Sequence, residues 1–191
     1  MAYFTPYTTN DAPIGSVEVL QAIEQDIKFI PNVFATIAES SLALNAVVSL
    51  SSAFAESSFT AHEQQVILLA TSTQNGCVYC VAGHTAFAQK QDMSKDIIDS
   101  LRNFASLSDE RLNTLNDTVR SLIVSKGQIS TATLLHFFDA GYSKRQFFEL
   151  VIGICLKTFT NYVSNALSIP LDEAFQSCEW ERPGKHIKKI A

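Results

Sequence analysis

Apolar residues along the chain recur at spacings of three and four, the period of an α-helix with one buried face. Ser16 is the expected cap of a first helix from Val17 towards Phe29, which Pro31 ends. Further helices are predicted over residues 32–38, 42–54, 61–74, 77–90, 95–101, 108–122, 131–140 and 144–166, with a last short helix opening at 170–173. Alternation with period two never persists, so the sequence predicts an all-α fold.

The most apolar predicted helix follows Thr60, which with Glu63 forms the pattern of a capping box. Residues 66–70 of this helix are apolar on every side, so it should lie in the centre of the fold. Asn75-Gly76 is a strong helix-ending signal, after which the chain enters the next helix at once.

The chain reads as one domain over residues 1–191, with an N-terminal arm at 1–15 and a loosely held C-terminal tail at 179–191. The order capped helix, glycine, short helix, serine-capped helix occurs at 60–104 and again at 108–161. This order suggests a helical bundle built from duplicated units.

A cluster of chemically reactive residues starts the helix at 77–90. Cys77, Cys80 and His84 follow the i, i+3, i+7 spacing, so both sulfurs and the imidazole project along one stripe of a helix. A helix start favours thiolate over thiol, and a neighbouring histidine adds a base or a cation. Two thiols at this spacing can close into a disulfide, which predicts two-electron thiol chemistry.

Composition narrows the possible partners. Of the 191 residues 47% are hydrophobic and only 17% charged, which suggests that apolar surface is buried between copies of the chain. The net charge of -5 offers nothing to neutralise a phosphate backbone, so no nucleic-acid partner is expected. The N-terminus has no secretory pattern and no apolar run spans a bilayer, which predicts a cytoplasmic protein without a membrane partner and with reduced thiols.

Less reactive interpretations of the same residues stay open. The cysteine pair could be half of a zinc site, although such sites usually have two pairs. Both cysteines could be inert packing residues, and His84 a packed or capping side chain. Cys155 and Cys178 lack basic neighbours at helical spacing and are assigned no function.

The segment from Glu63 through Asn75-Gly76-Cys77 to His84 resembles the core of the AhpD-like, or carboxymuconolactone decarboxylase-like, superfamily in its peroxidase-related branch. Residues 138–143, 148–151, 157–158, 161–162 and 170–175 are similar to that branch too. The resemblance covers roughly residues 15–180. It implies an AhpD-like helical bundle that assembles as a homotrimer or homohexamer.

The resemblance also implies roles for the site residues. The cysteine matching Cys80 attacks a peroxide, and the cysteine matching Cys77 resolves the product into a disulfide. No cofactor is expected to be bound; a lipoylated protein or another thiol donor would reduce the disulfide. The histidine matching His84 and a glutamate one helix upstream relay the proton. True carboxymuconolactone decarboxylases lack the cysteine pair, so lactone decarboxylation is not expected.

The sequence departs from this pattern at the relay. The glutamate position, twelve residues before Cys77, holds Gln65, which can hydrogen-bond but cannot take a proton. Tyr79 stands where AhpD has a histidine, and Ser164-Asn165 where many relatives have Asn-His. These differences weaken the peroxidase prediction more than thiol-disulfide exchange, which needs only an accessible dithiol and a stabilised thiolate.

The prediction is therefore a thiol-dependent oxidoreductase, an alkylhydroperoxidase-like enzyme that reduces peroxides or disulfides with Cys77 and Cys80. His84 would be the base or thiolate partner, and Gln65 would orient His84 or a water. The alternatives are a general protein disulfide reductase with little peroxidase activity and a non-enzymatic, redox-sensing oligomeric scaffold.

Overall fold

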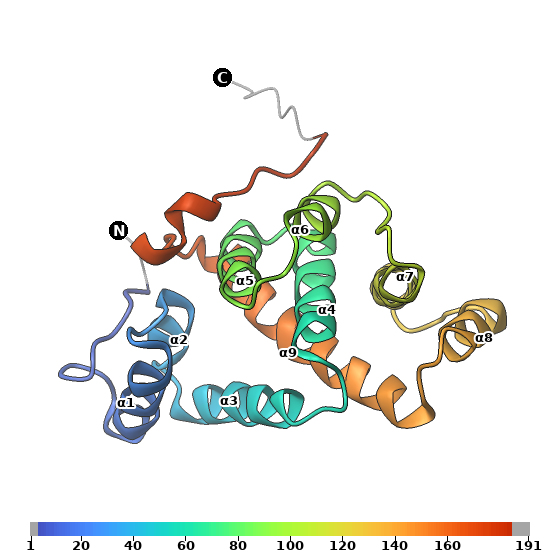
Figure 1. The fold of residues 1–191 in the computed structure, drawn as a ribbon. Coiled ribbons are helices and arrows are strands. Elements are labelled where there is room, and N and C mark those ends of the chain that lie inside the picture. Colours follow the sequence, from blue (N-terminus) through green and yellow to red (C-terminus); the bar gives the residue numbers. More distant parts are fainter. Residues whose placement is uncertain (1–3, 185–191) are drawn as a thin grey trace.

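A computed structural model describes residues 4–184, which form a bundle of nine α-helices and one 3-10 helix without any strand (Figure 1). The elements are α1 (Ile14–Ile27), α2 (Asn32–Ile37), α3 (Ser41–Ala55), α4 (Ala61–Gln74), α5 (Val78–Lys90), α6 (Lys95–Arg102), α7 (Glu110–Val124), α8 (Thr131–Asp139), α9 (Lys144–Leu167) and η1 (Glu173–Cys178). The predicted all-α class is confirmed. Within the described range, no helix has the length and hydropathy needed to cross a membrane.

Helix α4 lies at the centre of the bundle, in contact with α5, α6, α7 and α9 (Figure 1). It begins at the predicted capping box: Thr60 Oγ1 accepts from the Glu63 backbone N–H at 3.2 Å, and the Glu63 carboxylate accepts from the Thr60 N–H at 2.8 Å. Its side chains from Gln65 to Thr73 are all buried. The prediction of a central helix, buried all round, is confirmed.

A tight turn after α4 sets the start of α5. Gly76 has φ of +65°, a conformation that side chains with a Cβ disfavour. The Cys77 backbone N–H then donates to the Ser72 carbonyl at 3.0 Å, across the end of α4. The tight turn therefore places the first cysteine, Cys77, between the end of the central helix α4 and the start of α5.

The predicted start of the first helix is wrong. Helix α1 begins at Ile14, three residues earlier than expected, because Pro13 supplies a suitable φ just before the helix and needs no N–H there. Ser16 is fully buried and does not cap the helix; its hydroxyl donates to the Ala38 carbonyl at 2.7 Å. This bond ties α1 to the end of α2.

The C-terminal segment is held more firmly than the sequence suggested. Trp180 is buried, and its indole N–H donates to the Arg102 carbonyl at 3.0 Å. Arg102 in turn donates to the Cys178 and Glu179 carbonyls. The expectation of a loose tail from residue 179 is wrong for Trp180, and its continuation over 185–191 lies outside the described residues.

Candidate active site

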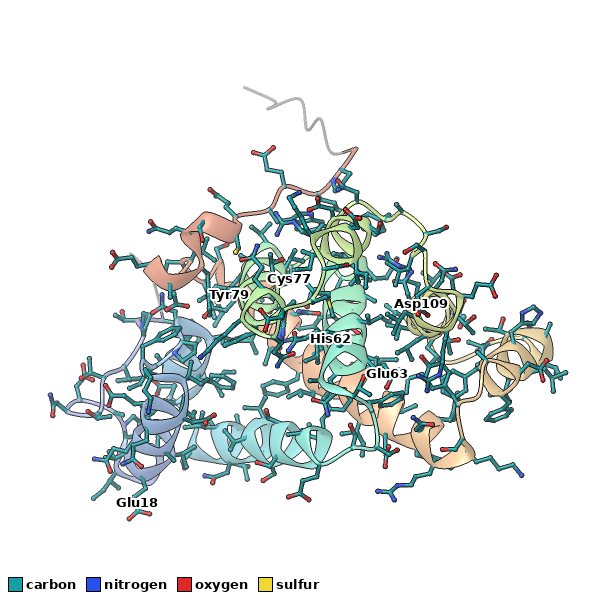
Figure 2. The ribbon with its side chains drawn as sticks, viewed as in Figure 1. Glu18, His62, Glu63, Cys77, Tyr79 and Asp109 are labelled. Carbon is teal, nitrogen blue, oxygen red and sulfur yellow. The ribbon has the colours of Figure 1, made fainter. Side chains whose placement is uncertain are left out.

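Cys77 and Cys80 lie together at the start of α5 and are both buried. Figure 2 shows Cys77 in the interior of the bundle. Cys77 is the N-cap residue, and its sulfur accepts from the Cys80 backbone N–H at 3.3 Å, as a serine hydroxyl would at this position. Both thiols are reduced in this structure. The cap brings the first sulfur over the helix start, beside the second cysteine.

The two thiols differ in acidity. Burial alone would raise the pKa of Cys80, but a hydrogen bond from the Cys77 thiol and the positive charge of Lys157 lower it from its usual 9.0 to about 6. Asn161 and Ser164 add further hydrogen bonds to the Cys80 sulfur. The Cys77 pKa is raised, first by its hydrogen bond to Cys80, then by burial and the adjacent negative charge. This arrangement supports Cys80 as the thiolate and Cys77 as the thiol.

This difference predicts a specific pH profile of alkylation. With a pKa of about 6, Cys80 should react with iodoacetamide at a rate that rises through pH 6 and is nearly constant above about pH 7, where roughly nine-tenths is thiolate. Peptide mass spectrometry in a Cys155→Ser, Cys178→Ser background reports each remaining thiol separately. A midpoint for Cys80 at pH 8 or above, or faster alkylation of Cys77 at pH 7, would contradict the assignment.

A hydrogen-bonded chain of three side chains lies beside Cys80. The imidazole of His84 contacts the Gln65 Oε1 with its Nδ1 at 3.1 Å and the Lys157 Nζ with its Nε2 at 2.7 Å. Because an amide oxygen and an ammonium group have opposite hydrogen-bonding roles, Nδ1 carries the proton and Nε2 accepts. Burial, together with the Lys157 charge, holds the pKa of His84 well below its usual value. His84 is therefore a neutral imidazole whose lone pair is already occupied.

Helix α9 contributes site residues to which the sequence analysis gave no role. Lys157, Asn161 and Ser164 are buried on one face of α9, and the Ser164 hydroxyl lies 3.9 Å from the Cys80 sulfur. The Asn161 amide also donates to the Ser72 hydroxyl at 3.3 Å, which fixes its orientation. One signal was available in the sequence: Lys157 interrupts the apolar run that includes Leu156 and Phe159, and a buried lysine is rare without a partner.

Cys80, His84 and Lys157 line a cavity of about 210 Å³. Its remaining walls are mostly apolar and include Ile27, Val33, Phe34, Phe54, Leu68, Phe87, Leu156 and Phe175. Cys80 is only 3% exposed, yet it faces this cavity, whereas Cys77 is fully buried and does not line it. An apolar cavity of roughly 150 Å³ is enough to bind benzene, so this one has room for a small organic molecule beside the thiolate.

Close packing shapes the aromatic wall of the cavity. Phe175 of η1 packs edge-on against Tyr79 and Phe87 of α5, and Gly83 permits this approach because an added Cβ would lie 3.2 Å from the Phe175 ring. The Tyr79 hydroxyl donates to the Asp172 carboxylate at 2.5 Å and accepts from the Val33 N–H at 3.3 Å. Tyr79, next to the reactive cysteine, thus anchors the chain segments around the cavity.

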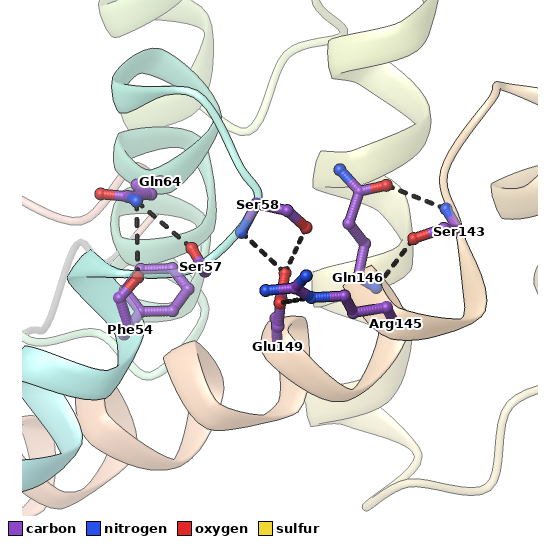
Figure 3. Close-up of polar contacts among 8 residues, drawn as sticks. All are labelled: Phe54, Ser57, Ser58, Gln64, Ser143, Arg145, Gln146 and Glu149. Carbon is purple, nitrogen blue, oxygen red and sulfur yellow. Dashed lines mark hydrogen bonds and ion pairs between the residues drawn. The ribbon is translucent and has the colours of Figure 1, made fainter.

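Polar contacts between α3, α4 and α9 hold another part of the cavity lining, which includes Phe54 and Gln64 (Figure 3). The Gln64 side chain, which also lines the cavity, donates to the Phe54 carbonyl at 3.4 Å and to the Ser57 hydroxyl at 3.2 Å. Glu149 of α9 accepts from the Ser58 backbone N–H at 2.9 Å. These contacts fix the loop between α3 and α4, and with it the position of Phe54.

The structure brings together the four residues predicted for the site, with Gln65 on α4 in direct contact with His84 on α5. Glu63 caps its own helix, as the capping-box pattern predicted, and it faces away from the cavity, where it pairs with Arg111 of α7 (Figure 2). Among residues 4–184, no group of three or more His, Cys, Asp or Glu side chains could hold a metal ion. Cys155 is exposed and Cys178 is buried away from this cavity.

Comparison with known proteins finds a family model that matches part of this chain. Residues 43–109, which contain α4, α5 and the cysteine pair, match the model of the carboxymuconolactone decarboxylase family. The match covers about a third of the chain, so it shows similarity to this family over the segment that carries the cysteines. This similarity supports the resemblance predicted from the motifs. No curated protein matches the sequence significantly.

Several crystal structures share the fold. An uncharacterized peroxidase-related protein from Ralstonia eutropha JMP134, described as an alkylhydroperoxidase AhpD core, is 20% identical with a TM-score of 0.81, covering 91% of this chain and 93% of its own. A peroxidase-related protein from Silicibacter sp. TM1040 is 19% identical, with a TM-score of 0.76 and coverages of 86% and 88%. The debrominase Bmp8, as a cysteine-to-alanine variant with 2,3,4-tribromopyrrole, is 18% identical, with a TM-score of 0.79 and coverages of 93% and 96%. At these identities the likeness establishes the AhpD-like fold.

Proposed function

We propose that this protein is a thiol-dependent peroxidase that reduces organic hydroperoxides through Cys80 and Cys77. One observation carries the proposal: Cys80 has a lowered pKa and faces an apolar cavity, while a second thiol lies directly behind it. The superfamily fold and the peroxidase-related structural neighbours are consistent with this chemistry. Thiol-disulfide exchange with a disulfide substrate would use the same two sulfurs, and it is the second candidate for the same reason.

The catalytic cycle follows from the positions of the two thiols. The Cys80 thiolate attacks the outer oxygen of a hydroperoxide, forming an S–O bond as the O–O bond breaks and releasing an alcohol once one proton is supplied. The Cys77 thiol then attacks the sulfenic acid on Cys80, forming a disulfide and releasing water. Two external thiol groups reduce this disulfide and are themselves oxidised to a disulfide.

Turnover assays with purified protein test the proposal. The chain should consume cumene hydroperoxide in the presence of dithiothreitol or dihydrolipoamide, and a disulfide between Cys77 and Cys80 should form when the reductant is omitted. A Cys155→Ser, Cys178→Ser variant is the matched control and should keep this activity, since neither residue lies at the cavity. Reduction of insulin or of a disulfide dye without peroxide consumption would favour the second candidate, and neither activity would favour a redox-sensing scaffold.

Gln65→Glu is expected to raise peroxide turnover several-fold. The amide of Gln65 accepts a hydrogen bond from His84 without taking a proton, whereas a carboxylate at the same place could accept one and complete a relay. Steady-state kinetics with cumene hydroperoxide measure the effect. Gln65→Leu, which removes the acceptor without adding charge, should show no gain. Equal or lower turnover in Gln65→Glu would contradict the relay argument.

We also propose that the reductant is a lipoylated protein or another thiol protein, and that the chain forms homotrimers or homohexamers. Large apolar side chains are exposed on α7, α8 and α9, namely Val124, Leu135, Phe148, Val151 and Tyr162. Large apolar side chains exposed in one chain are often buried where chains assemble. Light scattering should give a mass three or six times the 21.0 kDa of one chain, and a monomer at micromolar concentration would contradict the proposal.

A further inference from the structure

We propose that Lys157 is the acid that protonates the leaving alcohol. The Cys80 thiolate then loses its negative charge in the same step in which the Lys157 ammonium loses its positive charge. This inference rests on the proposed peroxidase function and assigns the proton that the reaction requires. It follows from where Lys157 lies, what contacts it and which groups beside it are unable to supply a proton.

Lys157 is a buried cation without a carboxylate partner among the described residues. Its side chain extends from α9 into the cavity wall, with 8% of the residue exposed. The ion pairs found within residues 4–184 are Lys95–Asp99, Arg111–Glu63 and Arg145–Glu149, and no Asp or Glu lines the cavity. A buried charge is costly unless an opposite charge accompanies it. The Cys80 thiolate is the anion available at this site, and Lys157 lowers its pKa.

The contact with His84 fixes Lys157 and rules out the imidazole as the direct acid. One Lys157 N–H is directed to the His84 Nε2 at 2.7 Å, which leaves two of its three protons for the sulfur and the substrate. The proton of His84 is on Nδ1, where it is bonded to the Gln65 amide oxygen and directed away from Lys157. Gln65 has no proton that it can give up at neutral pH. Of the three side chains in this hydrogen-bonded chain, Lys157 is thus the one that can give a proton to a molecule in the cavity.

The transfer conserves both atoms and charge. The thiolate sulfur bonds to the outer oxygen of the hydroperoxide, the O–O electron pair leaves with the inner oxygen, and that oxygen takes a proton from Lys157 to become an alcohol. The products are a Cys80 sulfenic acid and a neutral Lys157 amine, so the net charge of the pair is zero before and after. When external thiols later reduce the disulfide, the regenerated Cys80 thiol returns its proton to Lys157. The step therefore leaves no isolated charge in the buried site.

Two variants separate thiolate stabilisation from proton donation. Lys157→Met removes both, whereas Lys157→Arg keeps the positive charge but holds its proton too tightly to give it up. Alkylation by iodoacetamide needs a thiolate and no acid, while single-turnover reaction with cumene hydroperoxide needs both. At pH 7, the Cys80 of Lys157→Arg should be alkylated within about threefold of the wild-type rate. The same variant should react with the hydroperoxide at least about 100-fold more slowly than wild type. This is the range expected for loss of a general acid. Lys157→Met should be slowed in both reactions, and more in the second.

The outcomes distinguish this inference from the function on which it rests. Wild-type hydroperoxide rates in Lys157→Arg, or equal slowing of both reactions in Lys157→Met, would overturn the acid role while leaving the peroxidase in place. A wild-type protein that shows no Cys80-dependent reaction with hydroperoxide would overturn the function and the acid role together. Circular dichroism and thermal melts check folding, and the comparison of Lys157→Arg with wild type decides the question if Lys157→Met does not fold.

Discussion

Cys80→Ser is expected to lose hydroperoxide turnover by at least about 100-fold, whereas Cys77→Ser should react once and then stop. The first change removes the thiolate that faces the cavity. The second keeps the local structure, because a serine hydroxyl can accept the N-cap hydrogen bond that the Cys77 sulfur now accepts and can still donate to Cys80. Cys77→Ser is therefore the matched control for the fold.

The measurement follows one turnover without reductant. Cys77→Ser should consume one equivalent of cumene hydroperoxide and accumulate a sulfenic acid on Cys80, which dimedone labelling and mass spectrometry detect. Cys80→Ser should consume none. If Cys80→Ser retained a rapid burst and Cys77→Ser lost it, the roles of the two cysteines would be reversed.

Gly153→Ala is expected to lower the free energy of unfolding by about 1–3 kcal/mol, although alanine favours helices. An added Cβ at this point of α9 would lie 2.5 Å from the Phe54 ring and 3.0 Å from Ile67. The ring would have to move, and because Phe54 lines the cavity, the change should also alter the apparent KM for cumene hydroperoxide. Urea denaturation followed by circular dichroism measures the stability.

A second substitution tests whether the Phe54 contact is the cause. Phe54→Leu in the Gly153→Ala background removes the ring atoms nearest the new methyl group, so the combined loss should be smaller than the sum of the two single losses. Strict additivity, or a Gly153→Ala protein as stable as wild type, would show that α3 and α9 are not packed as closely as Gly153 indicates.

Local sequence patterns predicted most of the helices correctly. Caps such as Thr60, Ser94 and Ser143 act within four residues, and each begins a helix as expected. The first helix was placed too late because a serine at its start was taken for a cap, whereas burial against α2 decides the role of Ser16. The tail was expected to be loosely held, whereas Trp180 is held by a contact with Arg102, 78 residues earlier.

The same contrast applies to the candidate site. Cys77, Cys80 and His84 could be identified because one helical turn and its start place them together, and Gln65 was named through the family resemblance. Lys157 and Ser164 were given no role in the site, since they lie 73 and 84 residues from their partners His84 and Cys80. No spacing rule connects residues that are so far apart in the chain.

The sequence by itself determined an all-α chain and a dithiol at a helix start, because both depend on interactions within a few residues. The tertiary structure decided which sulfur is acidic and which faces a substrate cavity, because both depend on how α9 packs against α5. A charge or a hydrogen bond acts only over a few ångströms, so the chemistry of Cys80 is set by the neighbours that folding places around it.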